Sequence, residues 1–161
     1  MSSLNNQVAS LNSIIDQQID QINRLKLPGI IKDELAIPNL VDDMVRGIMD
    51  DFKLKNPQLA STVDALSPII TGALKSYLNT TIDFKTFNLN IVSVNRSASY
   101  LYDVAFAYTY TYPLRWGDIV GGIPIISGII TYVHFNIQFV ATVDAALDAI
   151  SNVQYRGLTI T

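Results

Sequence analysis

The chain has 161 residues, of which 49% are hydrophobic and 16% are charged, and this length predicts a single domain, 1–161, with a sizeable core. Its formal net charge is −3 and its 11 lysines and arginines are scattered rather than gathered in a basic stripe, so we expect no nucleic acid among its partners. The sequence contains no cysteine, which excludes disulfides, thiol catalysis and metal sites built on cysteine.

The N-terminal residues predict an amphipathic helix. Asp20 and Arg24 are spaced to form an ion pair on its exposed side. The helix is expected to end at Leu27-Pro28-Gly29, because proline disfavours helical geometry in the residue before it. The segment has fewer heptads than a usual coiled coil, so we expect its apolar face to pack against the core. The residues of that face recur at alternating spacings of four and three, with Gln18 as the one gap: Leu4, Val8, Leu11, Ile15, Ile22 and Leu25.

The first residues also bear on localisation. They lack the basic region and the apolar run that characterise a signal peptide. A cytoplasmic protein and a secreted mature form therefore both remain open.

Two further helical stretches are predicted before residue 80. The first is expected to begin near Pro38, a residue that suits the first turn of a helix. The second is expected to begin at Asn56-Pro57, and Ser67-Pro68 predicts a kink or a restart within it. Residues 1–80 are therefore expected to form the helical part of the chain.

After Phe84 the apolar residues recur with a period of two, which is typical of strands. Strands are expected near Phe87–Ile91, from Tyr100 to Pro113 and from Ile129 to Val143, and a last short strand lies within 153–160. Helices followed by strands indicate an α+β fold. We predict about three N-terminal helices packed on a long-stranded, curled antiparallel β-sheet formed by residues 84–161.

The second of these strands has one heavy aromatic face. The residues of that face alternate with small ones and are Tyr100, Tyr102, Val104, Phe106, Tyr108, Tyr110 and Tyr112. Such a face is either ordinary core or the wall of a ligand cavity, and buried tyrosine hydroxyls need partners that a polar ligand head can supply. The candidate ligand-binding residues on this strand and the next are Tyr100, Tyr102, Phe106, Tyr108, Tyr110, Val133, Phe135 and Phe139.

No motif favours catalysis or metal binding. His134 is the only histidine; it is expected on the more polar face of its strand, and no nucleophile elbow accompanies it. The acidic residues Asp42, Asp43, Asp50 and Asp51 lack the spacing of a calcium-binding loop. We therefore predict that the chain is not an enzyme, with no catalytic residue, no metal site and no cofactor.

No charged residue lies between Asp118 and Asp144, and the interval exceeds the roughly 20 residues that a membrane-spanning helix needs. Glycines and Pro124 interrupt its first half, and its second half alternates like a strand, which argues against a span. The apolar loop 119–130, with Trp116 at its base, is the part best suited to touch a membrane surface.

Two stretches resemble a known family. IIDQQIDQINRLKLPG (14–29) and LAIPNLVDD (35–43), with the long strands after Phe84, resemble the arthropod group 7 allergen type of elongated, tubular lipid-binding folds. In those folds a curled antiparallel sheet wraps a long helix. The chain is shorter than such proteins and has no evident second terminal helix. The resemblance implies a non-catalytic protein that binds a hydrophobic ligand or a lipid-like surface, and it transfers no individual binding residue.

Together these patterns favour non-enzymatic binding or carriage of a hydrophobic small molecule or lipid in an apolar, tyrosine-rich cavity between helices and sheet. The alternative is a self-assembling structural or membrane-interacting protein, which uses exposed apolar surface and the 119–130 loop. Its partners would be further copies in a homo-oligomer or a membrane contacted peripherally. Whether a cavity lies over Tyr102, Phe106 and Tyr110 decides between the two.

Overall fold

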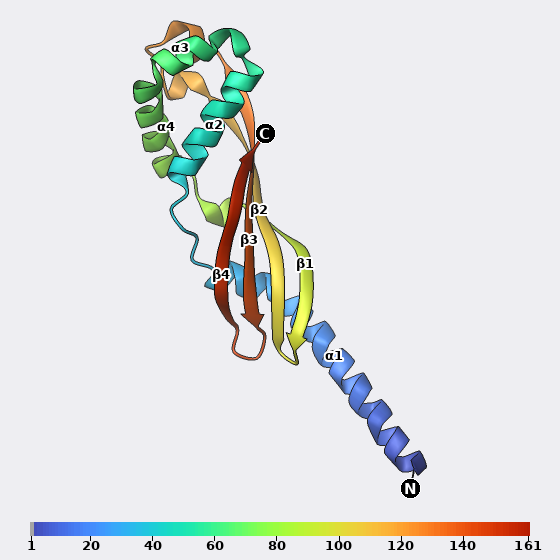
Figure 1. Cartoon of the computed structure of the whole chain (residues 1–161). Coiled ribbons are helices and arrows are strands. Elements are labelled where there is room, and N and C mark those ends of the chain that lie inside the picture. Colours follow the sequence, from blue (N-terminus) through green and yellow to red (C-terminus); the bar gives the residue numbers. More distant parts are fainter. Residues whose placement is uncertain (1) are drawn as a thin grey trace. The chain divides into compact units, whose positions relative to one another are not determined.

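The computed structural model describes residues 2–161 (Figure 1). Its helices are α1 (Ser2–Glu34), α2 (Val41–Lys55), α3 (Ala60–Ala65), α4 (Ser67–Thr81) and α5 (Pro124–Ser127), with short 3-10 turns η1 (Pro57–Leu59), η2 (Phe84–Thr86) and η3 (Trp116–Asp118). Its strands are β1 (Asn88–Ala98), β2 (Leu101–Arg115), β3 (Ile130–Asp144) and β4 (Ala149–Ile160). The strands form one antiparallel curled sheet in the order β1-β2-β3-β4. The predicted α+β fold, with helices before the sheet, is confirmed.

The chain forms two compact units, and each unit contains part of every strand. The first consists of Met1–Ala36, Ile91–Phe106 and Phe139–Tyr155, and the second of Ile37–Asn90, Ala107–Gln138 and Arg156–Thr161. Helix α1 therefore belongs to the first unit, and helices α2 to α5 belong to the second. That these units make up one domain remains a prediction.

Helix α1 is longer than predicted, because it continues through Pro28 to Glu34. Leu27 and Ile31, on either side of the proline, are both fully buried. An interior proline costs a helix about 3 kcal/mol, and the burial of two aliphatic side chains, worth about 1.5–3 kcal/mol each, offsets that cost. The expected helix end at Leu27-Pro28-Gly29 is therefore wrong.

The apolar face of α1 is not in the core. Its residues Leu4, Val8, Leu11, Ile15, Ile22 and Leu25 are between 48% and 83% exposed. The opposite face packs instead, where Asn23, Leu27 and Ile31 are buried. The expectation that the predicted apolar face packs against the core is wrong, because the sheet of the first unit binds the other side of the helix.

The remaining N-terminal helices bury the faces that the sequence pattern indicates, although α2 begins at Val41 rather than near Pro38, so that expected start is wrong. Helix α2 buries the predicted face, including Met44, Ile48 and Phe52. The interruption predicted at Ser67-Pro68 is a restart, because α3 ends at Ala65 and α4 begins at Ser67 with the proline in its first turn. The third predicted helical stretch is thus two separate helices.

Strand β2 continues past Pro113 to Arg115, so the expected strand end at Pro113 is wrong. The β1–β2 turn and the side-chain hydrogen bond from Asn90 to Thr109 fix a register in which Pro113 lies opposite residue 86, before β1 begins. The proline nitrogen therefore faces no strand on that side, as at a sheet edge. The last strand is also longer than predicted, since β4 spans 12 residues.

Candidate functional site

The predicted aromatic wall lies almost entirely in the core. Tyr102, Phe106, Tyr108, Val133, Phe135 and Phe139 are each 5% exposed or less. Tyr110 is half-buried, and Tyr100 lies in the turn between β1 and β2, where it is exposed. Side chains with so little accessible area belong to the hydrophobic core, which is close-packed in proteins.

In the first unit the structure brings Phe106 and Phe139 together. Their rings stack with centroids 5.6 Å apart, and Phe139 also contacts Tyr155 on β4. The hydroxyl of Tyr102 donates to Asp20 Oδ1 on α1 at 2.7 Å. Burial, and then this hydrogen bond, raise the pKa of Tyr102. The protein itself thus supplies the hydroxyl partner that we expected of a ligand.

In the second unit a partly buried aromatic cluster joins α4, η2, β2 and β3. Phe87 stacks on Tyr110 with ring centroids 4.9 Å apart, and it also contacts Phe84 and Phe135. The hydroxyls of Tyr77 and Tyr112 are 2.6 Å apart. Burial and this contact raise the pKa of Tyr77 to about 12. Of the predicted site residues only Tyr110 and Phe135 belong to this cluster; the strand alternation that identifies them carries no signal for its helical and loop members.

His134 lies on the polar face of β3, as predicted, and is exposed. Its Nδ1 is 2.7 Å from Thr111 Oγ1, and its backbone exchanges hydrogen bonds of 3.0 and 3.1 Å with Thr161. The shallow hollow beside it is lined mainly by hydroxyl and amide side chains, including Thr109 and Asn136. This arrangement suits hydrogen bonding, and no carboxylate lines the described hollow.

Residues 2–161 form neither a metal site nor a membrane-spanning helix. No three histidine, aspartate or glutamate side chains of this part of the chain come together as they would to hold a metal ion. Among the described helices, none has the length and apolar character needed to cross a membrane.

The 119–130 loop is only partly exposed. Trp116 at its base is 1% exposed, donates from Nε1 to Thr131 Oγ1 at 3.0 Å and packs against Phe52. The expectation that Trp116 suits a membrane interface is therefore wrong, because both its ring and its N–H are engaged inside the second unit. Ile125, in the loop, is 64% exposed.

Polar side chains bind α1 to the sheet on the side of the helix that lies opposite its apolar face. The Arg96 guanidinium on β1 binds both carboxylate oxygens of Asp16 at 2.9 Å. Arg24 pairs with Asp20 at 3.1 Å, as predicted. The hydrogen bond from Arg96 lowers the pKa of Asp16, and the hydrogen bond from Tyr102 lowers that of Asp20.

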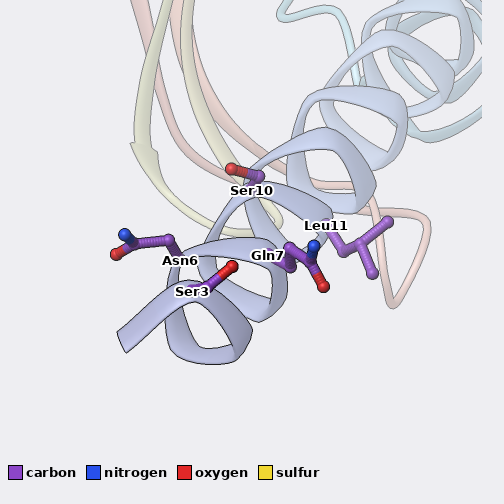
Figure 2. A pocket seen from close by; sticks show the side chains of 5 residues that line it. All are labelled: Ser3, Asn6, Gln7, Ser10 and Leu11. Atoms are coloured by element: carbon purple, nitrogen blue, oxygen red, sulfur yellow. The ribbon is translucent and has the colours of Figure 1, made fainter. Parts of the chain in front are cut away.

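The exposed apolar face of α1 is the largest feature left without a role. Every residue from 3 to 18 is exposed, and the N-terminal turns of α1 extend away from the β1–β2 turn of the same unit (Figure 1). A hollow beside these turns is lined by Ser3, Asn6, Gln7, Ser10 and Leu11 (Figure 2). All five belong to α1, so the hollow is an open surface groove rather than an enclosed cavity.

Comparisons of the chain with the models of known protein families, with curated proteins and with solved structures find no match. The resemblance to the group 7 allergen type therefore stays a prediction.

Proposed function

We propose that the chain is a non-enzymatic interaction protein that works by binding another surface with the exposed apolar face of α1. The observation that carries the proposal is the exposure of this face, from Leu4 at 59% to Leu25 at 83%. Contiguous exposed apolar surface on a folded protein marks an interaction site. The full burial of Tyr102 and Phe106 supports surface binding over carriage inside a cavity.

A pair of charge substitutions tests this function. Ile15→Glu places a carboxylate in the middle of the apolar face, whereas Gln17→Glu places the same charge on the same exposed helix outside that face. Two assays follow the full chain: sedimentation velocity over a range of concentrations, and flotation with neutral phosphatidylcholine vesicles. We expect Ile15→Glu to weaken self-association or vesicle binding in one of these assays, and Gln17→Glu to leave both unchanged. Identical behaviour of both variants and the parent chain in both assays would contradict it.

Carriage of a hydrophobic small molecule or lipid is the second candidate. It is favoured by the half-buried cluster of Tyr77, Phe84, Tyr110 and Tyr112, which leaves aromatic surface partly uncovered in the second unit. Native mass spectrometry of the purified chain, together with titration of a fluorescent fatty acid, tests it. A co-purified adduct, or saturable uptake that Tyr110→Ala weakens, would support carriage. The absence of both would rule it out.

A further inference from the structure

We infer that the exposed face of α1 binds the same face of a second copy of the chain, in a parallel two-stranded coiled coil. The inference rests on the proposed function and names its partner. The apolar residues of α1 keep a spacing of four and three from Leu4 to Leu25 with Gln18 as the one gap, which is the a/d pattern of a heptad repeat. An amphipathic helix that only covers a core has a wider stripe and no need of this period.

The residue types at these positions are those of a two-stranded coil. With Leu4 as the first d position, the a positions carry only β-branched residues: Val8, Ile15 and Ile22. The d positions carry leucine with one exception: Leu4, Leu11, Gln18 and Leu25. β-branched residues at a with leucine at d favour two parallel strands over three or four.

Gln18 discriminates between the two directions of pairing. In a parallel pair in register, each Gln18 faces the Gln18 of the second copy, and the two amides can hydrogen-bond to each other. In an antiparallel pair a d position faces an a position, so Gln18 faces an apolar residue such as Val8, and a buried amide without a partner costs about 1–3 kcal/mol. A single polar residue in the seam thereby fixes orientation and register.

The residues that flank the seam do not repel a second copy. The g positions are Gln7, Ile14 and Gln21, and the e positions are Asn5, Asn12, Ile19 and Lys26. The single charge among them is Lys26, whose ammonium already pairs with Asp148 at 2.7 Å. In the parallel pair Ile14 meets Ile19 of the second copy, which widens the apolar seam. Only one basic residue, Lys26, flanks the seam, and its ammonium is already paired, which favours a second copy over an anionic membrane.

The sheet leaves the seam accessible. Asp16, Asp20 and Asn23, which bind Arg96, Tyr102 and Ser99, occupy the b and f positions on the opposite side of the helix. Two chains can therefore join along the seam with their sheets facing outward. These contacts also anchor α1, so a coil of three heptads does not have to order an isolated helix, which would be only marginally stable at that length.

The exposed area is sufficient for a specific dimer. Seven apolar side chains on or beside the seam are 48% exposed or more: Leu4, Val8, Leu11, Ile14, Ile15, Ile22 and Leu25. At on the order of 100 Å² for each aliphatic side chain, they offer roughly 700 Å² per copy. Two copies together then bury roughly 1,400 Å², above the ~1,000 Å² expected of a biological interface.

Sedimentation equilibrium of the full chain tests the stoichiometry. We expect a concentration-dependent species of twice the 17.8 kDa chain mass. Ile15→Glu should raise the dimer dissociation constant about 100-fold or more, because it places two like charges in a dry seam. Gln17→Glu, at an outward c position, should leave the constant unchanged. A trimer or tetramer, or a chain that stays monomeric across the concentration range, would overturn the inference.

Oxidative crosslinking tests the orientation. The chain contains no cysteine, so any disulfide in Leu11→Cys must join two copies at that position. A parallel coil brings the two introduced thiols together and gives a rapid covalent dimer, and Gln17→Cys serves as the control that should crosslink slowly. Equal rates for the two variants, or crosslinking only in a mixture of Leu11→Cys with Ile15→Cys, would overturn the parallel arrangement.

The vesicle assay separates this inference from the proposed function. The chain could be monomeric and still float with neutral vesicles, with Ile15→Glu abolishing the flotation. The face then binds a lipid surface: the inferred dimer is wrong, and the proposed function holds. If Ile15→Glu changes neither mass nor flotation, both fail. Circular dichroism of each variant confirms that α1 and the sheet remain folded.

Discussion

The guanidinium of Arg96 binds both carboxylate oxygens of Asp16, with Nη1 and Nη2 each 2.9 Å from an oxygen, across 80 residues of sequence. This bidentate geometry is the strongest form of ion pair between these groups. It lies beside the hydrogen bond from Tyr102 to Asp20, one turn further along the helix. Both contacts bind α1 to the β1–β2 hairpin and so determine which face of the helix stays exposed.

We expect Asp16→Asn to loosen the middle of α1 from the hairpin without unfolding the sheet. The amide cannot accept two charge-assisted hydrogen bonds from Arg96, so backbone amides of α1 near residue 16 should exchange faster with solvent. Hydrogen exchange followed by mass spectrometry measures this. The matched control is Asp33→Asn, an exposed carboxylate near the end of the same helix. Unchanged exchange in Asp16→Asn would show that the ion pair does not hold the helix.

The same contacts predict how acid affects the first unit. The pKa values of Asp16 and Asp20 are both lowered from 3.8, by hydrogen bonds from Arg96 and Tyr102 respectively. A carboxyl with a lowered folded-state pKa stabilises the fold fully above its unfolded pKa and loses that contribution as the pH falls through the folded value. The urea midpoint should therefore be level between pH 5 and 7 and fall below about pH 4. An Asp16→Asn, Asp20→Asn double variant should show a smaller fall, and equal curves would contradict the assignment.

The sequence pattern predicted much of the fold, because in most elements the face on which apolar residues recur is also the face that packs in the core. Helix α2 and strand β3 bury the faces that their periods indicate. The helix end predicted at Pro28 is wrong because the burial of Leu27 and Ile31 outweighs the cost of a few kcal/mol that a proline imposes inside a helix. The strand end predicted at Pro113 is wrong because a proline ends a strand only where another strand lies opposite its nitrogen. The register of β1 against β2 decides this, and it is set by a turn more than ten residues away.

The candidate site was harder to predict than the fold. Alternation identifies the heavy face of β2, but only tertiary packing decides whether Phe106 borders a cavity or another side chain. For α1 the sequence shows the spacing of the apolar residues, but it does not show that the face they form is exposed to solvent. Arg96 and Tyr102 select the opposite face of that helix, and no local signal pairs them with Asp16 and Asp20.

Glycine at position 117 is required by a close approach in the second unit. A Cβ at Gly117 would lie 2.7 Å from the carbonyl oxygen of Ser127, which is backbone and cannot rotate away. Gly117→Ala should therefore destabilise the chain by about 1–3 kcal/mol. In contrast, Gly72→Ala in α4 meets nothing within 4 Å and should stabilise it by about 0.5–1 kcal/mol. Urea unfolding of both variants measures these shifts, and a neutral Gly117→Ala would contradict the predicted clash.

The pair of hydroxyls formed by Tyr77 and Tyr112 predicts an unusual alkaline titration. Burial, and then the hydrogen bond with Tyr112, raise the pKa of Tyr77 from 10.0 to about 12. Because the raised value belongs to the folded state, this contribution to stability is complete below pH 10 and is lost as the pH rises through about 12. The phenolate absorbance of the folded chain should therefore include a component, due to Tyr77, that titrates near pH 12.

Two variants locate that component. Tyr112→Phe removes the hydrogen bond but leaves the burial of Tyr77, so the late component should move toward 10 without reaching it. Tyr132→Phe removes a tyrosine that is 63% exposed and has no contact with Tyr77, so it should leave the late component in place. Near-UV circular dichroism recorded at each pH establishes that the chain is still folded when Tyr77 ionises. If every tyrosine ionises near its usual pKa of about 10 while the chain is folded, the hydroxyl pair is not protected from solvent.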